Sequence, residues 1–233
     1  MRKIEILTAF ETEINQIDNE VTKPSTDESL YWLNQSVYKF VKLRFNGDTV
    51  RGTGYEQTEK RRNDLYRLFK STTYNLEDDD ILSKASYNQY TIVYPYDFLY
   101  SLNEDVVITD NEGGNEIDTC VFECTQDSFM YRVNNSLTDF HYRNHKARPI
   151  RTRTNDGCLL LTDGKYKIKN YTLGYLRNPK EITLKNPDDA YSEYEDFDDS
   201  TIHEIIKIAA QMYLENKGNQ RYQSITAEVM TQE

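Results

Sequence analysis

Residues 198–223 read DDSTIHEIIKIAAQMYLENKGNQRYQ, and this stretch predicts the helix around which the rest of the chain folds. Its apolar side chains recur at steps of three and four residues, the spacing that lines one face of a helix; they are Ile202, Ile205, Ile206, Ala209, Met212 and Tyr213. Thr201 and Glu204 have the spacing of a capping box, and Lys217 with Gly218 fits the end of a helix. We expect this face to pack against another helix.

Two more helices are predicted near the N-terminus. A narrow apolar seam runs along Lys3–Glu20, and Ser25 with Glu28 forms a capping box that opens a second helix through Arg44. Because only a few residues join the two helices, residues 3–46 are expected to form an antiparallel helical hairpin.

A third helix is predicted over Tyr55–Lys70, where a short apolar stripe lies among Lys, Arg and Glu side chains. We interpret the basic run as a solvated helix face. Contact with nucleic acid or with an acidic neighbour is the alternative.

The middle of the chain is predicted to form strands, because short runs rich in Val, Ile, Thr, Tyr and Leu are separated by turn residues. The predicted strands are Gln89–Tyr94, Asp105–Thr109, Asp118–Thr125, Ala147–Arg153, Cys158–Thr162, Tyr166–Thr172 and Glu181–Leu184. Asp163 and Gly164 tolerate positive φ and predict a hairpin turn between two of these runs. Gln126–Leu137 is predicted to form a short helix that crosses the sheet.

The predicted fold class is α+β, with a helical bundle built from the N-terminal helices and the C-terminal helix. An antiparallel β domain, a small barrel or sandwich, is inserted between them. We place the helical hairpin and third helix in residues 1–80, the β domain in residues 81–187, and an acidic link, the closing helix and a tail in residues 188–233. The two helical segments are expected to pack together.

Composition limits the classes of function. The chain has 233 residues, a formal net charge of -11 and 19 Tyr, so it can bury a core but does not suit a general nucleic-acid binder. Its three cysteines are expected to be buried free thiols in a reducing compartment. No signal peptide or membrane span is predicted, so we expect synthesis in the cytosol and no membrane partner.

The sequence shows no convincing catalytic, metal or cofactor site, so we expect a protein without enzymatic activity. His141 and His145 are four residues apart, but no carboxylate lies between them as a metalloprotease helix would require. The run from Asp110 to Asn115 resembles a calcium loop in composition, but its ligand positions do not match, and a hairpin turn explains it better.

Two clusters are candidates for interaction sites. The basic one comprises Arg143, Lys146, Arg148, Arg151 and Arg153, which could face DNA without reading its sequence or form salt bridges to a neighbouring copy. The other is the acidic link NPDDAYSEYEDFDD at residues 186–199, which is expected to be an exposed loop or docking arm with Tyr191, Tyr194 and Phe197 as contact residues.

Four segments together resemble the head-to-tail connector, or adaptor, proteins of tailed bacteriophages, most closely the ring proteins of crAss-like phages. They are ESLYWLNQSVYKFVKLRFNG, YTIVYPYDFLY, LLLTDGKYKIKNYTLGYLRNPKEI and STIHEIIKIAAQMYLENKGNQRYQS, which lie within residues 28–224. The last resembles the closing helix of such connectors, and the resemblance rests on the order and combination of all four.

This resemblance implies a virion protein without catalysis, assembled as a ring of twelve copies beneath the portal and around the DNA channel. Its implied partners are the portal, the next tail ring protein and passing double-stranded DNA. The C-terminal segment in such proteins reaches toward the portal, which implies contacts from Arg221, Tyr222, Ile225 and Val229.

Two other functions remain open from the sequence. A phage tail accessory module could bind a host surface or carbohydrate through its β domain, although the only tryptophan, Trp32, lies in the predicted N-terminal hairpin. A hydrolase with a dispersed active site is the third hypothesis.

Overall fold

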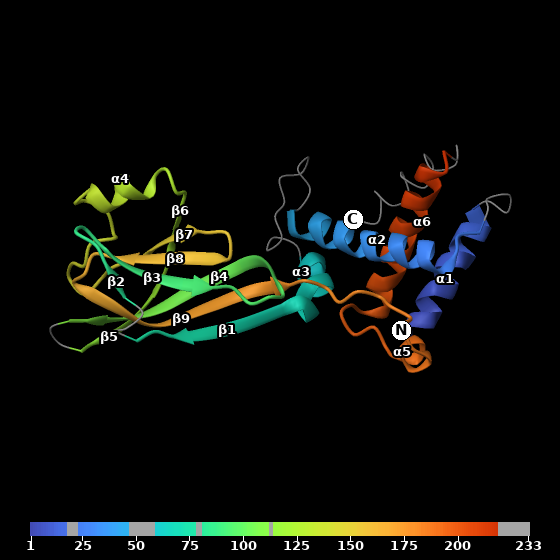
Figure 1. The fold of residues 1–233 in the computed structure, drawn as a ribbon, viewed down its shortest axis with the longest axis horizontal. Coiled ribbons are helices and arrows are strands. Elements are labelled where there is room, and N and C mark those ends of the chain that lie inside the picture. The colour runs from blue at the N-terminus through green and yellow to red at the C-terminus, as the bar shows by residue number, and fades with distance from the viewer. Residues whose placement is uncertain (18–22, 47–58, 78–80, 112–113, 219–233) are drawn as a thin grey trace. The chain divides into compact units, whose positions relative to one another are not determined.

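The computed structural model describes residues 1–17, 23–46, 59–77, 81–111 and 114–218. These residues form two compact units, one helical and one made mainly of strands (Figure 1). The helical unit comprises Met1–Leu68 and Pro179–Glu233, and the strand unit comprises Phe69–Asn178. The boundaries between the two units therefore lie after Leu68 and Asn178, whereas the sequence predicted boundaries after residues 80 and 187. The fold is mixed α+β.

Five helices of the helical unit are described. They are α1 (Lys3–Ile17), α2 (Thr26–Asn46), α3 (Glu59–Leu65), α5 (Pro187–Tyr191) and α6 (Asp199–Asn216). Helix α6 packs against both α1 and α2, and the hairpin helices also contact each other. The predicted capping residue is in place at α2, where the Glu28 backbone N–H donates to Ser25 Oγ over 3.2 Å.

The apolar face of α6 is buried as its spacing predicted, and Ala209 and Ala210 are completely inaccessible to solvent. Tyr213 belongs to the same core and makes edge-on ring contacts with Phe10 of α1 and Trp32 of α2. The predicted capping box at Thr201 was wrong, because the N-cap is Asp198 and Thr201 already lies within the helix. The C-cap is Lys217, and the positive φ of Gly218 ends the helix as expected.

The third predicted helix is shorter than expected. Its described part consists of α3 and a single 3₁₀ turn at Tyr66–Leu68, and the chain then enters strand β1 (Phe69–Asn75). Helix was therefore the wrong prediction for Phe69 and Lys70. The predicted start at Tyr55 lies outside the described residues.

Two sheets make up the strand unit. The four-stranded sheet has the order β1-β9-β4-β5, with β4 at Phe98–Asp110, β5 at Glu116–Cys120 and β9 at Tyr166–Arg177. The five-stranded sheet has the order β2-β3-β8-β7-β6 and contains β2 (Leu82–Ser83), β3 (Asn88–Val93), β6 (Phe122–Cys124), β7 (Ile150–Arg153) and β8 (Gly157–Thr162). In the described residues, neither sheet closes into a barrel.

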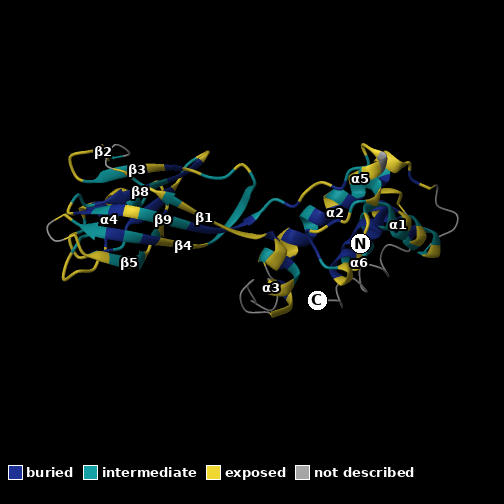
Figure 2. Ribbon diagram, turned by 90° about the horizontal axis from the view of Figure 1, so that it is seen from below, coloured by how far each residue is buried: buried dark blue, intermediate teal, exposed yellow. Residues whose placement is uncertain are grey.

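The predicted turn at Asp163 and Gly164 is present, and Gly164 has a φ of 78°. The predicted hairpin was wrong, because β8 and β9 do not pair with each other: β8 belongs to the five-stranded sheet and β9 to the four-stranded sheet, so the turn carries the chain from one sheet to the other. Side chains from both sheets share one core, with members such as Ile92, Val106 and Leu160. Figure 2 colours buried residues of the strand unit dark blue. The other face of the five-stranded sheet is partly covered by α4 (Phe129–Asn134), the short helix that the sequence predicted within Gln126–Leu137.

Three strand predictions need correction. Strands β6 and β7 pair in parallel, so the β unit is not purely antiparallel; the long connection through α4 provides the crossover that parallel pairing requires. The predicted strand Asp118–Thr125 is interrupted at Val121 and contributes to both sheets. Residues Glu181–Leu184 form no strand, because they run along the helical unit, where Ile182 is buried and its N–H donates to Asn34 Oδ1.

Candidate assembly surfaces

The acidic link before α6 is largely built into the helical unit. Tyr194 and Phe197 are 4% and 1% exposed, so the prediction of an exposed docking arm was wrong for these two residues. The Tyr194 hydroxyl donates to the Lys180 carbonyl over 2.8 Å, and the Phe197 ring lies edge-on to Phe40. Tyr191 is 66% exposed and remains available for a partner.

Backbone pairing explains why the link is held in place. The Lys3 N–H donates to the Ser192 carbonyl and the Tyr194 N–H to the Met1 carbonyl, both over 3.0 Å, so the link runs antiparallel to the start of the chain. The Lys180 N–H donates to the buried carboxylate of Asp196 over 2.6 Å. The sequence contained a signal for this burial, since the aromatic side chains of the link have a large apolar area that is stabilised by removal from water.

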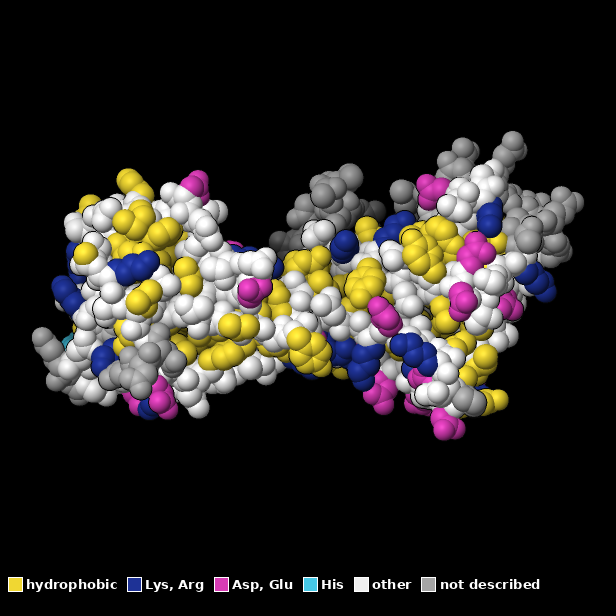
Figure 3. Space-filling view, in the orientation of Figure 1, with side chains coloured by type: hydrophobic (Ala, Val, Ile, Leu, Met, Phe, Trp, Pro, Cys, Tyr) yellow, Lys and Arg dark blue, Asp and Glu magenta, His cyan; other side chains and the backbone are white. Residues whose placement is uncertain are grey.

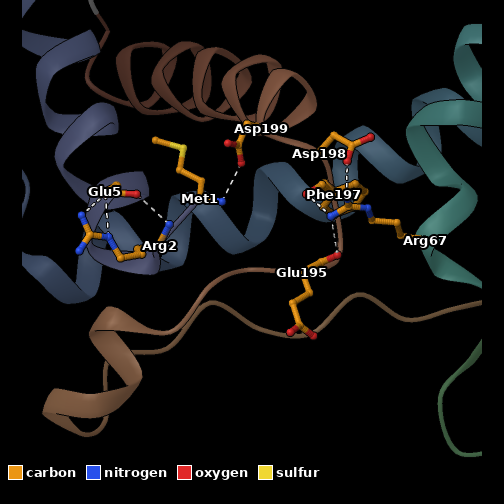
Figure 4. A network of polar contacts seen from close by, with 8 residues as sticks. All are labelled: Met1, Arg2, Glu5, Arg67, Glu195, Phe197, Asp198 and Asp199. Atoms are coloured by element: carbon orange, nitrogen blue, oxygen red, sulfur yellow. Dashed lines mark hydrogen bonds and ion pairs between the residues drawn. The ribbon is translucent and has the colours of Figure 1, made fainter.

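The start of α6 is surrounded by polar contacts (Figure 4). Arg67 forms an ion pair with Asp198 and donates to the carbonyls of Glu195 and Phe197 over 3.3 Å each. The N-terminal amino group pairs with Asp199 Oδ1 over 2.7 Å. Because these carboxylates and guanidinium are solvent-accessible, each ion pair contributes little free energy, but together they orient the link and the first turn of the helix.

A second charged cluster joins three helices of this unit. Arg44 of α2 is 4% exposed and pairs with Asp64 of α3 through Nε and Oδ2 at 2.9 Å, and with Glu204 of α6 at 2.5 Å. Lys60 completes the cluster at 3.0 Å from Glu204. Burial raises the pKa of Asp64, although Arg44 acts in the opposite direction. The cluster fixes helix packing and contains no nucleophile or base aimed at a pocket.

The strand unit separates the predicted basic cluster into buried and exposed members. Arg151 is 5% exposed and lies between two carboxylates, with Nη2 at 2.8 Å from Glu104 Oε1 and Nη1 at 3.0 Å from Glu123 Oε1. Arg151 therefore cannot face DNA or a neighbouring copy. The missed signal was in β4, where Glu104 alternates with Val106 and Ile108 and so lies on the buried face, where a carboxylate needs a cation.

The other basic residues lie at the surface. Arg148 is partly buried, with a carboxylate oxygen of Asp139 at 3.6 Å, whereas Arg143, Lys146 and Arg153 are exposed. Arg143 and Lys146 exchange backbone hydrogen bonds of 3.0 and 2.9 Å, and the two residues between them, Asn144 and His145, have positive φ. This tight turn presents the Arg143 and Lys146 side chains on the strand unit.

Apolar side chains are also exposed on the strand unit, around α4. Met130, Tyr131 and Leu137 are 42%, 75% and 85% exposed. Figure 3 shows hydrophobic side chains beside basic ones over this part of the unit. Beneath them the guanidinium of Arg132 lies 3.5 Å from the centre of the Phe122 ring, which fixes the underside of the helix.

A groove in the strand unit has a volume of about 490 Å³ and runs over β4 and β5. Its lining includes Asp105, Asp118 and Cys120, and none of the described residues that line it is aromatic. Among the described residues, no group of three or more His, Cys, Asp or Glu could hold a metal ion. The four predicted C-terminal contacts, Arg221, Tyr222, Ile225 and Val229, lie outside the described residues.

No helix within the described ranges has both the length and the apolar character needed to cross a bilayer. No curated protein matched the chain. A family model described as phage tail ring protein 3/4 matches residues 3–212, which include the whole strand unit and most of the helical unit. The chain therefore belongs to this family of crAss-like phage ring proteins and is a structural component of a phage tail.

Proposed function

We propose that this protein is a subunit of a head-to-tail connector ring that joins the portal to the tail and surrounds the channel for double-stranded DNA. The observation that carries the proposal is the family match over residues 3–212. In this proposal α1, α2 and α6 form the helical bundle of the subunit and the two sheets form its inserted sandwich. The subunit acts through its shape and contacts and catalyses no reaction.

The ring contains twelve copies in this proposal, with the portal on one side and the next tail ring protein on the other. The C-terminal segment after Gly218 contacts the portal, with Arg221, Tyr222, Ile225 and Val229 as contact residues. Tyr191 lies on the same helical unit and is exposed, which supports a role for it at a junction between rings. Tyr194 and Phe197 no longer belong to this surface because they are buried.

The exposed members of the basic cluster, Arg143, Lys146 and Arg153, either contact passing DNA or pair with acidic residues of the neighbouring copy. The formal net charge of -11 supports a channel that does not retain DNA, since a strongly basic wall would bind phosphate by releasing counterions. Because Arg151 lies in the core, only the exposed members of the basic cluster can reach DNA. This small number of cations supports a contact with DNA that is weak and transient.

Native mass measurement of the full-length chain, alone and mixed with the portal protein of the same phage, tests this function. The proposal expects rings or a defined portal complex. A variant truncated after Gly218 serves as the matched control, because it retains α1 to α6 and both sheets but should lose portal binding. A chain that remains monomeric under both conditions and is missing from intact virions would contradict the proposal.

A further inference from the structure

The four-stranded sheet has two open edges, formed by β1 and β5. Strand β1 is seven residues long and contains no Pro or Gly, and no hydrogen bond joins its outer backbone edge to another described residue. The same holds for the outer edge of β5 among the described ranges. Long, regular open edges are templates for pairing with another strand, and proteins usually protect them with proline, bulges or very short strands.

Strand direction decides which second strand fits. β1 and β4 are both antiparallel to β9, and β5 is antiparallel to β4, so β1 and β5 run in opposite directions. In a ring, each copy is related to the next by a rotation that keeps the strands of both sheets in the same orientation. The β5 strand of one copy can then lie beside the β1 strand of its neighbour. The two strands then meet in antiparallel orientation, which is the more stable form of pairing.

The register of the sheet shows which side chains would lie at the same level. Thr73 is opposite Thr172, Thr172 opposite Asp105, and Asp105 opposite Cys120. A neighbouring sheet that continues without an axial offset would therefore place its Cys120 level with Thr73. An offset of two residues in either direction would place it level with Ser71 or Asn75 on the same face.

The alternative edge pairings fit less well. β5 carries exposed carboxylates at Glu116 and Asp118, so pairing β5 with a second β5 would place like charges opposite each other. Pairing β1 with a second β1 requires a two-fold axis, which ends in a dimer and cannot continue around a ring. The outward face of β1 carries Ser71, Thr73 and Asn75, which are uncharged and produce no repulsion against β5.

We propose that neighbouring copies of this chain join through β1 of one copy and β5 of the next, so that the four-stranded sheets become one continuous sheet. This inference rests on the proposed ring assembly and adds to it the surface by which the copies recognise each other. Backbone hydrogen bonds supply the contact, and the alternation of the outer side chains sets the register.

Cysteine cross-linking tests the pairing, because β5 already carries an exposed thiol. Cys120 is exposed, Cys124 and Cys158 are buried, and burial raises the pKa of Cys158 to about 11, so Cys120 should react preferentially. Ser71→Cys, Thr73→Cys and Asn75→Cys are introduced separately into the full-length chain, and rings are isolated by size before mild oxidation. Within one copy two strands separate Thr73 from Cys120, a distance of roughly 14 Å that a disulfide cannot bridge.

We expect one of these three variants to give a ladder of covalent oligomers in denaturing gels, with more than tenfold more product than the controls. Thr72→Cys is the matched control, since its side chain lies on the opposite face of β1. Leu137→Cys is an exposed cysteine near α4 that measures random collision. Replacing Cys120 by Ser in the productive variant should abolish the ladder.

Rings that form normally but give no ladder from any of the three variants would overturn the edge pairing and leave the proposed function intact. A chain that forms no ring, alone or with the portal, contradicts the proposed function and the pairing with it. Hydrogen exchange provides a second measurement, because pairing should slow exchange of β1 amides in the ring at least tenfold relative to the dissociated chain, with α4 amides unchanged. Equal exchange of β1 in both states would also contradict the pairing.

Discussion

The two compact units each bury an arginine, but in different surroundings. Arg151 of the strand unit and its main partner, Glu104, both have side chains that are 6% exposed. Arg44 of the helical unit is as deeply buried, but Asp64 and Glu204 remain 11% and 24% exposed. The comparison shows that two buried arginines can contribute differently to the free energy of unfolding. A carboxylate partner that reaches water can be solvated when the arginine is lost, whereas a buried partner cannot.

The hydrophobic interiors differ as well. The largest completely buried side chains of the strand unit include Tyr90, Tyr166 and Tyr171, whose hydroxyl groups need partners. Tyr166 donates to the Phe140 carbonyl over 3.2 Å, and Tyr90 accepts from the Ile168 N–H over 3.2 Å. The core face of α6, in contrast, is mainly Ile, Ala and Leu. The strand unit therefore depends more on internal polar bonds.

Arg151→Ala should give the largest effect. The change leaves Glu104 buried without its cation and should lower the free energy of unfolding of the strand unit by about 3–5 kcal/mol. Chemical denaturation followed by circular dichroism measures it. Trp32 is the only tryptophan and lies in α2, so its fluorescence reports the helical unit separately. Arg153→Ala is the exposed control, and an equal effect there would remove the distinction between buried and exposed arginines.

Arg44→Ala should have a smaller effect. Loss of its charged hydrogen bonds should cost about 2–3 kcal/mol, because Glu204 and Asp64 can regain some hydration. Denaturation followed by Trp32 fluorescence measures this change. Lys60→Ala, which removes the exposed partner of Glu204, should cost no more than about 0.5 kcal/mol. A loss for Arg44→Ala as large as that for Arg151→Ala would break the comparison.

Tyr166→Phe should destabilise the strand unit by about 1 kcal/mol, since the ring is kept and the hydrogen bond to the Phe140 carbonyl is lost. Thermal or chemical unfolding followed by circular dichroism gives the value. Tyr131→Phe is the matched control, because its side chain is 75% exposed. If both variants unfold like the parent chain, the tyrosine hydroxyls contribute nothing to the difference between the units.

Acid should weaken the strand unit through Asp97. Partial burial alone would raise the pKa of Asp97, but hydrogen bonds from Lys70 at 2.6 Å and Tyr175 at 3.0 Å outweigh it and lower that pKa. A lowered carboxyl pKa stabilises the fold above about pH 4 and loses this contribution as the pH falls through the folded value. Unfolding midpoints measured from pH 7 to pH 3 should therefore converge for the parent chain and Asp97→Asn. Parallel pH profiles would contradict the assignment.

Regular periodicity was predictable from the sequence, and long-range pairing was not. The three-and-four spacing around Ile206 predicted α6, and Asp163 with Gly164 predicted the turn between β8 and β9, but not that these strands pair in different sheets. Strand β1 was missed because FKSTTYN has no apolar alternation and follows a charged helix; its pairing with β9 is what makes it a strand.

The candidate contact residues were less predictable, for the same reason. Tyr194, Phe197 and Arg151 have the composition of surface contacts, but their partners are distant in sequence, at Lys180, Phe40 and Glu104. Patterns in a single sequence indicate local spacing, but they do not show which distant residues contact each other in the fold. Inspection of the buried face of β4 could have identified Glu104 as a carboxylate in need of a cation.

The strand unit is entered and left at neighbouring points, since Phe69 at the start of β1 pairs with Leu176 near the end of β9. Antiparallel partners lie about 5 Å apart, so a short turn could span the gap if the whole unit were removed. The strand unit can thus be treated as a separable insertion in the helical unit. Over evolutionary time, related phages could enlarge, shrink or exchange it by recombination while the gene segments on either side continued to encode the same helical scaffold.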